Sequence, residues 1–155
     1  MDYRDAQQAD RLELAEQLGP YTLIAEISSG EFTTVHLAHK RGAHGFDRLV
    51  AIKRLKPAYA RQPEWSQLLL DEARLGASVD HPNTVDILDV GTDAGVYVVM
   101  DYVEGADLEQ LLARAGRERH PRFVLPSLID ALTGLHAIHT QKDELGEPLA
   151  MVHQA

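Results

Sequence analysis

The chain has 155 residues, of which 45% are hydrophobic and 25% are charged, so it can bury a core and is too apolar for wholesale disorder. Its formal net charge of -9 argues against a broad nucleic-acid contact, and the absence of cysteine excludes disulfides and thiolate metal sites. The polar, acidic N-terminus is unlike a secretory signal, and the most apolar run, Val96–Met100, is too short to cross a bilayer. We therefore expect a cytoplasmic globular protein with no nucleic-acid or membrane partner.

The first part of the chain is predicted to contain one helix and then strands. Helical spacing of leucine and alanine predicts a helix over Asp10–Leu18, which Gly19 and Pro20 end. Five segments rich in β-branched and aromatic residues follow, and the predicted strands are Tyr21–Ile27, Thr33–His39, Leu49–Leu55, Thr84–Val90 and Val96–Tyr102.

One predicted helix lies between the third and fourth strands, and helices alone follow the fifth strand. Pro57–Gly76 contains a helix with Pro63 near its first turn. Beyond Gly105, one short helix is expected from a cap at Asp107, and a second over Pro126–His139. Strands grouped before helices predict an α+β fold, in which a small five-stranded antiparallel sheet lies beside a helical segment.

Lys53 and Glu72 are predicted to form an ion pair. Strand alternation puts Lys53 on one face with Leu49 and Ala51, and Val50 and Ile52 on the other. A lone lysine near a strand end is usually solvated. However, Glu72 falls on the apolar stripe of the following helix, which consists of Trp65, Leu68, Leu69, Leu75 and Val79. A carboxylate that faces a core needs a cation, and Lys53 is the nearest lysine on an inward strand face.

Gly30 lies in a turn between the first two predicted strands. A glycine in a tight hairpin commonly serves the backbone conformation alone. The alternative is that a flexible hairpin here lays backbone N–H groups over phosphates.

These segments together resemble the small lobe of eukaryotic-like (Hanks-type) bacterial serine/threonine protein kinases. "ISSGEFTTV" stands at the place of the Gly-rich loop, "VAIK" matches the third-strand lysine motif, and Glu72 matches the helix glutamate that pairs with the lysine. "DEARLGASVDHPNTVDILDVG" and "VYVVMDYVEGADLEQLL" are similar to the helix-to-hinge stretch. Gly30 is the one retained glycine of the three in the loop, with Ser28 and Thr33 in the outer places.

The resemblance implies three domains and a partial ATP site. Residues 1–18 would be a helical extension, 19–103 the small lobe with its hinge, and 104–155 the first two helices of an incomplete large lobe. Lys53 would hold the α- and β-phosphates, and Glu72 would orient it. The remaining implied cofactor-binding residues are Ile27, Val35 and Ala51 in the adenine roof, Gly30 in the loop, Met100 at the back, the backbone of Asp101 and Val103 at the adenine edge, and Asp107 toward the ribose.

The end of the chain departs from the family pattern. "LTGLHAIH" and "MVH" match the approach to the H-R-D motif, but Gln154 stands at the arginine position and Ala155 at that of the catalytic aspartate. The resemblance therefore implies a truncated, catalytically inactive kinase-like chain, either a pseudokinase or a kinase fragment, that binds ATP weakly or not at all. No metal site is expected, because His136 and His139 have no third ligand at suitable spacing.

A second hypothesis is a non-catalytic interaction module. The helix over 126–139 carries an apolar stripe of Leu128, Ile129, Leu132, Leu135 and Ile138. We expect a homo-oligomer, or a protein partner, to cover this stripe.

Overall fold

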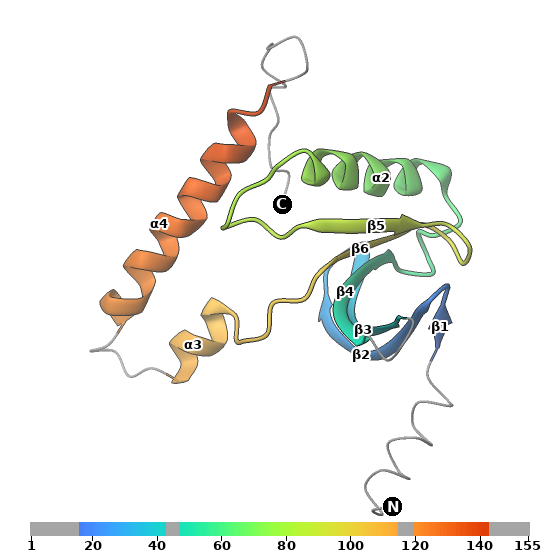
Figure 1. Ribbon diagram of the computed structural model, residues 1–155, viewed down its shortest axis with the longest axis horizontal. Helices are drawn as coiled ribbons and strands as arrows, with labels where there is room; N and C mark the ends of the chain where they lie inside the picture. The colour runs from blue at the N-terminus through green and yellow to red at the C-terminus, as the bar shows by residue number, and fades with distance from the viewer. Residues whose placement is uncertain (1–15, 43–46, 115–119, 143–155) are drawn as a thin grey trace, which may run out of the picture. The chain divides into compact units, whose positions relative to one another are not determined.

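The computed structural model describes residues 16–42, 47–114 and 120–142, and for residues 120–123 the backbone alone. Within these ranges it contains a six-stranded sheet and three helices (Figure 1). The strands are β1 (Gln17–Leu18), β2 (Tyr21–Ser29), β3 (Thr33–Arg41), β4 (Asp47–Leu55), β5 (Ile87–Gly91) and β6 (Tyr97–Asp101). The helices are α2 (Pro63–Ala77), α3 (Leu108–Arg114) and α4 (His120–His139). The α+β class is confirmed.

The described residues divide into two compact units. The first contains the residues up to Arg74 together with Ile87–Tyr102, and the second contains Leu75–Asp86 and the residues from Val103 onward. The last turn of α2 thus clusters with the later helices. None of the helices in the described part of the chain is both long and apolar enough to span a membrane.

All neighbouring strands in the sheet are antiparallel, in the order β1-β2-β3-β4-β6-β5. The five predicted strands are confirmed as β2 to β6, with ends that move by a few residues. The prediction of a helix reaching Leu18 is wrong, because Gln17 and Leu18 pair with Thr22 and Tyr21 as strand β1. The earlier part of that predicted helix lies outside the described residues.

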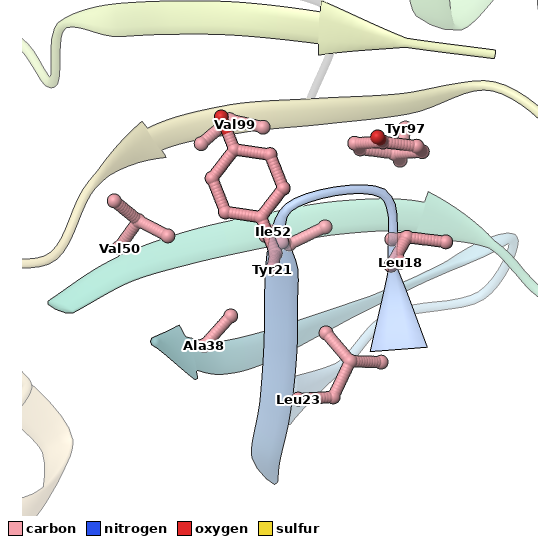
Figure 2. Close-up of a cluster of buried hydrophobic side chains, with 8 residues drawn as sticks. All are labelled: Leu18, Tyr21, Leu23, Ala38, Val50, Ile52, Tyr97 and Val99. Carbon is pink, nitrogen blue, oxygen red and sulfur yellow. The ribbon is translucent and has the colours of Figure 1, made fainter. Parts of the chain in front are cut away.

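The core of the sheet lies on the face that carries Val50 and Ile52. Figure 2 shows eight buried side chains that converge from β1, β2, β3, β4 and β6. They are Leu18, Tyr21, Leu23, Ala38, Val50, Ile52, Tyr97 and Val99. Strand alternation explains why Val50 and Ile52 point into this core while Lys53 points to the other face.

The sheet is curved so strongly that β2, near one edge, contacts β5 at the other edge. The Tyr21 hydroxyl on β2 donates a hydrogen bond to Asp89 on β5 (3.2 Å), although three strands separate β2 from β5 in the sheet order. The Tyr21 and Tyr97 rings pack edge to face at 6.3 Å. Gly19, in the turn between β1 and β2, has a left-handed φ of 55° and lies against the Tyr97 hydroxyl. The buried cluster of Figure 2 is therefore enclosed within a strongly curved sheet.

Helix α2 packs on the opposite face of the sheet. Its buried residues Leu69 and Ala73 meet Leu55 of β4 and Val98 of β6, and Trp65 packs against the same cluster. Pro63 at the first helical position and Glu64 in the first turn favour the start of the helix at this point. The second cluster fixes α2 against the two strands that carry Lys53 and Val98.

In the second unit, the loop that contains Asn83 is hydrogen-bonded to α4. Asn83 donates from its side-chain amide to the Asp130 carbonyl (3.0 Å) and to Thr133 Oγ1 (2.8 Å). Helix α4 begins six residues before the predicted start and contains Pro126. Pro126 has no N–H to donate to the carbonyl four residues earlier, so α4 lacks one of its internal hydrogen bonds at this point. The predicted cap of α3 is confirmed, since Asp107 Oδ1 accepts a hydrogen bond from the Gln110 N–H (2.7 Å).

Candidate functional site

Strand register places two of the three predicted roof residues, Val35 and Ala51, on one face of the sheet. Val35 pairs with Lys53, and Lys53 pairs with Val98. In the next row, Leu37 pairs with Ala51, and Ala51 pairs with Met100. Because directly paired residues of antiparallel strands point to the same side, the two rows form one surface opposite the core of Figure 2. Leu37 also belongs to this surface, although it was not among the predicted site residues.

The structure brings Lys53 and Glu72 together. Lys53 Nζ lies 2.5 Å from Glu72 Oε1, and the two residues come from β4 and α2. The predicted ion pair is therefore confirmed. Its lysine side chain is 24% exposed and its glutamate side chain 61% exposed, so the expectation that Glu72 is shielded from water is wrong.

Glu72 is exposed because α2 turns a different face toward the sheet from the one predicted. Its buried line runs through Trp65, Leu69 and Ala73, with steps of four residues. Leu68 and Leu75 of the predicted stripe are exposed, and Glu72 lies at the edge of the buried line. The prediction assumed that the large leucines face the sheet. In the structure the small residue Ala73 is buried there, and its size allows the helix to approach the sheet.

The surface around Lys53 is apolar and partly open. Ala51 is buried, while Val35 and Met100 are half-buried. Ile27 occupies a register shift in β2 between Glu26 and Ser28, and its side chain is exposed. Apolar groups beside a fixed ammonium provide a flat contact for a ring and a charge for an anion.

The turn that contains Gly30 has room for a ligand. The Gly30 N–H donates to the Thr33 carbonyl (2.9 Å), which closes a tight turn. Positive φ angles among the described glycines occur at Gly19 and Gly95, not at Gly30. A Cβ built on Gly30 would approach no atom closer than 3.7 Å. The conformation of this turn therefore does not require glycine, and the backbone stays open to close approach from outside.

The hinge residues fall into different units. Asp101 ends β6, and its carboxylate forms an ion pair with Arg48 on β4. Val103 and Asp107 belong to the second unit, where Val103 is exposed and Asp107 caps α3. Their predicted roles at the adenine edge and the ribose stay predictions. Gln154 and Ala155 lie outside the described residues.

An aromatic cluster next to the site was missed from the sequence. Phe32, two residues after Gly30, stacks on Trp65 of α2 with ring centroids 4.3 Å apart. Tyr59 packs edge to face on both rings, at 5.1 Å from Phe32 and 5.2 Å from Trp65. Three aromatic residues with separations of 27 and 6 positions give no periodic pattern, so only the folded chain reveals them.

Comparisons with known proteins show the family of the chain. The family model for protein tyrosine and serine/threonine kinases matches residues 21–146. The tyrosine-protein kinase MasK of Myxococcus xanthus is 40% identical over 151 residues, which are 95% of this chain and 23% of MasK. The serine/threonine-protein kinase PrkC of Bacillus subtilis is 34% identical over 76% of this chain and 18% of PrkC.

A solved structure supports the same relationship. The crystal structure of the PknI kinase domain of Mycobacterium tuberculosis matches with a TM-score of 0.58 and 26% identity, over 81% of this chain and 51% of that domain. The chain thus spans about half of a solved kinase domain and about a fifth of the curated relatives. The chain belongs to the protein tyrosine and serine/threonine kinase family, and it contains a kinase small lobe and part of the large lobe.

Proposed function

We propose that the surface formed by Val35, Ala51, Lys53 and Met100 binds ATP. The observation that carries this proposal is the Lys53–Glu72 pair, which holds an ammonium at the edge of an open apolar surface. The phosphates would meet Lys53 Nζ and the backbone of the turn at Gly30, and the adenine would lie on Ala51 and its neighbours.

We further propose that binding by the 155-residue chain is weak and insensitive to magnesium. Its sequence has no D-F-G string, which in kinases supplies the aspartate that holds the metal. Alanine at position 155 cannot accept a proton from a substrate hydroxyl. The chain by itself is then an inactive, pseudokinase-like or fragmentary kinase module. The ATP site would operate in the cytoplasm.

Calorimetry with ATP tests this proposal. Lys53→Met should weaken ATP binding about tenfold, since it removes a charge-assisted contact with the phosphates. Lys56→Met, three residues along the chain, is the matched control and should bind as the unmodified chain does. Equal ATP affinity in Lys53→Met would contradict the proposal, and so would tight binding that depends on magnesium. Radiolabelled phosphate transfer that disappears in Lys53→Met would contradict the inactive assignment.

A second candidate function is that of an interaction module that self-associates through α4. Among the predicted stripe residues, Leu128, Ile129 and Leu132 are exposed, while Leu135 and Ile138 are half-buried. These three side chains are 47–62% exposed, so each would gain about half of the roughly 1.5–3 kcal/mol that burial of a fully exposed aliphatic side chain provides. Sedimentation velocity should show dimers or larger species that Leu132→Glu dissociates, whereas Leu111→Glu on α3 should not. A monomer at high concentration would contradict this role.

A further inference from the structure

The Lys53–Glu72 pair depends on the placement of two separate elements. Lys53 lies on β4 and Glu72 on α2, and their 2.5 Å contact requires a fixed spacing between strand and helix. The connection between β4 and α2, residues 56–62, contains turns and no strand or helix. Packing of Leu69 and Ala73 on the sheet holds the middle of α2, and the N-terminal end of the helix has contacts of its own.

The aromatic cluster of Phe32, Tyr59 and Trp65 lies where the two elements begin to separate. The Phe32 carbonyl accepts a hydrogen bond from the Lys56 N–H (2.9 Å), three residues after Lys53. The Phe32 ring stacks on Trp65, seven residues or about two helical turns before Glu72. Phe32 is thus attached to the end of β4 by its backbone and to α2 by its ring.

The remaining contacts fix the tryptophan. Tyr59 packs on both other rings, and its N–H donates to the Lys56 carbonyl (2.9 Å). The Trp65 indole N–H donates to Gln62 Oε1 (3.2 Å), and the ring packs on the cluster that contains Leu69 and Ala73. Each ring therefore packs against the other two, and the cluster joins the end of β4 to the start of α2.

We propose that Phe32 and Trp65 are positioning residues that hold α2 where Glu72 meets Lys53, and that they couple the Gly30 turn to α2. The inference rests on the proposed ATP site, because Phe32 directly follows the turn that would contact the phosphates. A ligand that orders this turn then favours the placed helix, and by linkage the placed helix favours the ligand.

The chain carries a built-in probe for this coupling, since Trp65 is its single tryptophan. Titration with ATP should change Trp65 fluorescence, with the same midpoint as the calorimetric titration. Phe32→Leu should abolish the fluorescence change and weaken ATP binding about fivefold. Phe32→Tyr keeps the aromatic ring, so this variant should retain both the fluorescence change and the ATP affinity of the unmodified chain. Unchanged ATP affinity in Phe32→Leu would overturn the coupling.

Hydrogen exchange tests the positioning role without any ligand. In Phe32→Leu, amides of α2 around Leu69–Ala73 should exchange faster, while those at Ile52 and Val99 in the other core should not change. If the α2 amides of Phe32→Leu exchange as slowly as those of the unmodified chain, the positioning role is overturned even if ATP binds. Absence of calorimetric ATP binding to the unmodified chain would overturn the proposed function alone, and α2 exchange would still decide the role of Phe32.

Discussion

The ring of Tyr97 on β6 lies directly over Gly91 on β5, so that a Cβ at position 91 would overlap the ring. The ring is buried in the core of the curved sheet, and its hydroxyl donates to Asp93 Oδ1 (2.8 Å). Gly91 therefore leaves room for the Tyr97 ring to lie over the neighbouring strand.

Gly91→Ala should destabilise the sheet by about 3 kcal/mol, because the methyl group would force Tyr97 out of its packed position. Urea unfolding measures this loss. Gly105→Ala is the control, since nothing lies within 4 Å of its Cβ position, and it should change stability by less than about 0.5 kcal/mol. Similar stability of the two variants would show that the ring does not occupy this place.

Stability should fall in alkaline solution because of Tyr97. Burial, followed by the hydrogen bond to Asp93, raises the pKa of Tyr97 from 10.0 to about 12. The unfolded chain then loses this proton at lower pH than the folded chain. The contribution is fully present below pH 10 and is lost as the pH rises toward 12, by roughly 2 kcal/mol in total.

Measuring the unfolding free energy between pH 8 and about pH 11.5 gives the slope of stability against pH, which tests this prediction. In Tyr97→Phe the slope should be smaller, although not zero, because burial also raises the pKa of Tyr21. An unchanged slope in Tyr97→Phe would contradict the assignment.

Asn83 should hold α4 in the second unit. Asn83→Ala removes the bonds to the Asp130 carbonyl and Thr133 Oγ1, at a cost of about 1–2 kcal/mol. Gly134→Ala should act similarly, since its Cβ would lie 2.8 Å from the Asn83 carbonyl oxygen. Faster hydrogen exchange in α4 of both variants is the expected result. Protection equal to that of the unmodified chain would mean that the loop does not support the helix.

Much of the fold could be predicted because its elements are periodic. Alternation identified β4 and placed Lys53 opposite Val50, and the need of a carboxylate for a cation identified Glu72. That second argument reached the right partner from a wrong premise, since Glu72 is exposed.

The features that were missed depend on pairing and packing that give no periodic pattern in the sequence. Strand β1 has two residues, too few for any period, and is defined by its pairing with β2. The closeness of α2 to the sheet depends on Ala73, and the stacking of Phe32 on Trp65 joins positions 33 residues apart. These contacts are fixed by the folded chain and leave no periodic signal in the sequence.

Methyl NMR during an ATP titration tests the central claim most directly, because the two faces of β4 carry separate probes. We predict shift changes at the methyl groups of Val35, Ala51 and Met100, which share a face with Lys53, and small or no changes at Val50, Ile52 and Val99 in the opposite core. Lys53→Met should reduce the changes at the first set. Absence of shifts at millimolar ATP, or shifts confined to residues away from the Lys53 face, would contradict the assignment of this surface as an ATP site.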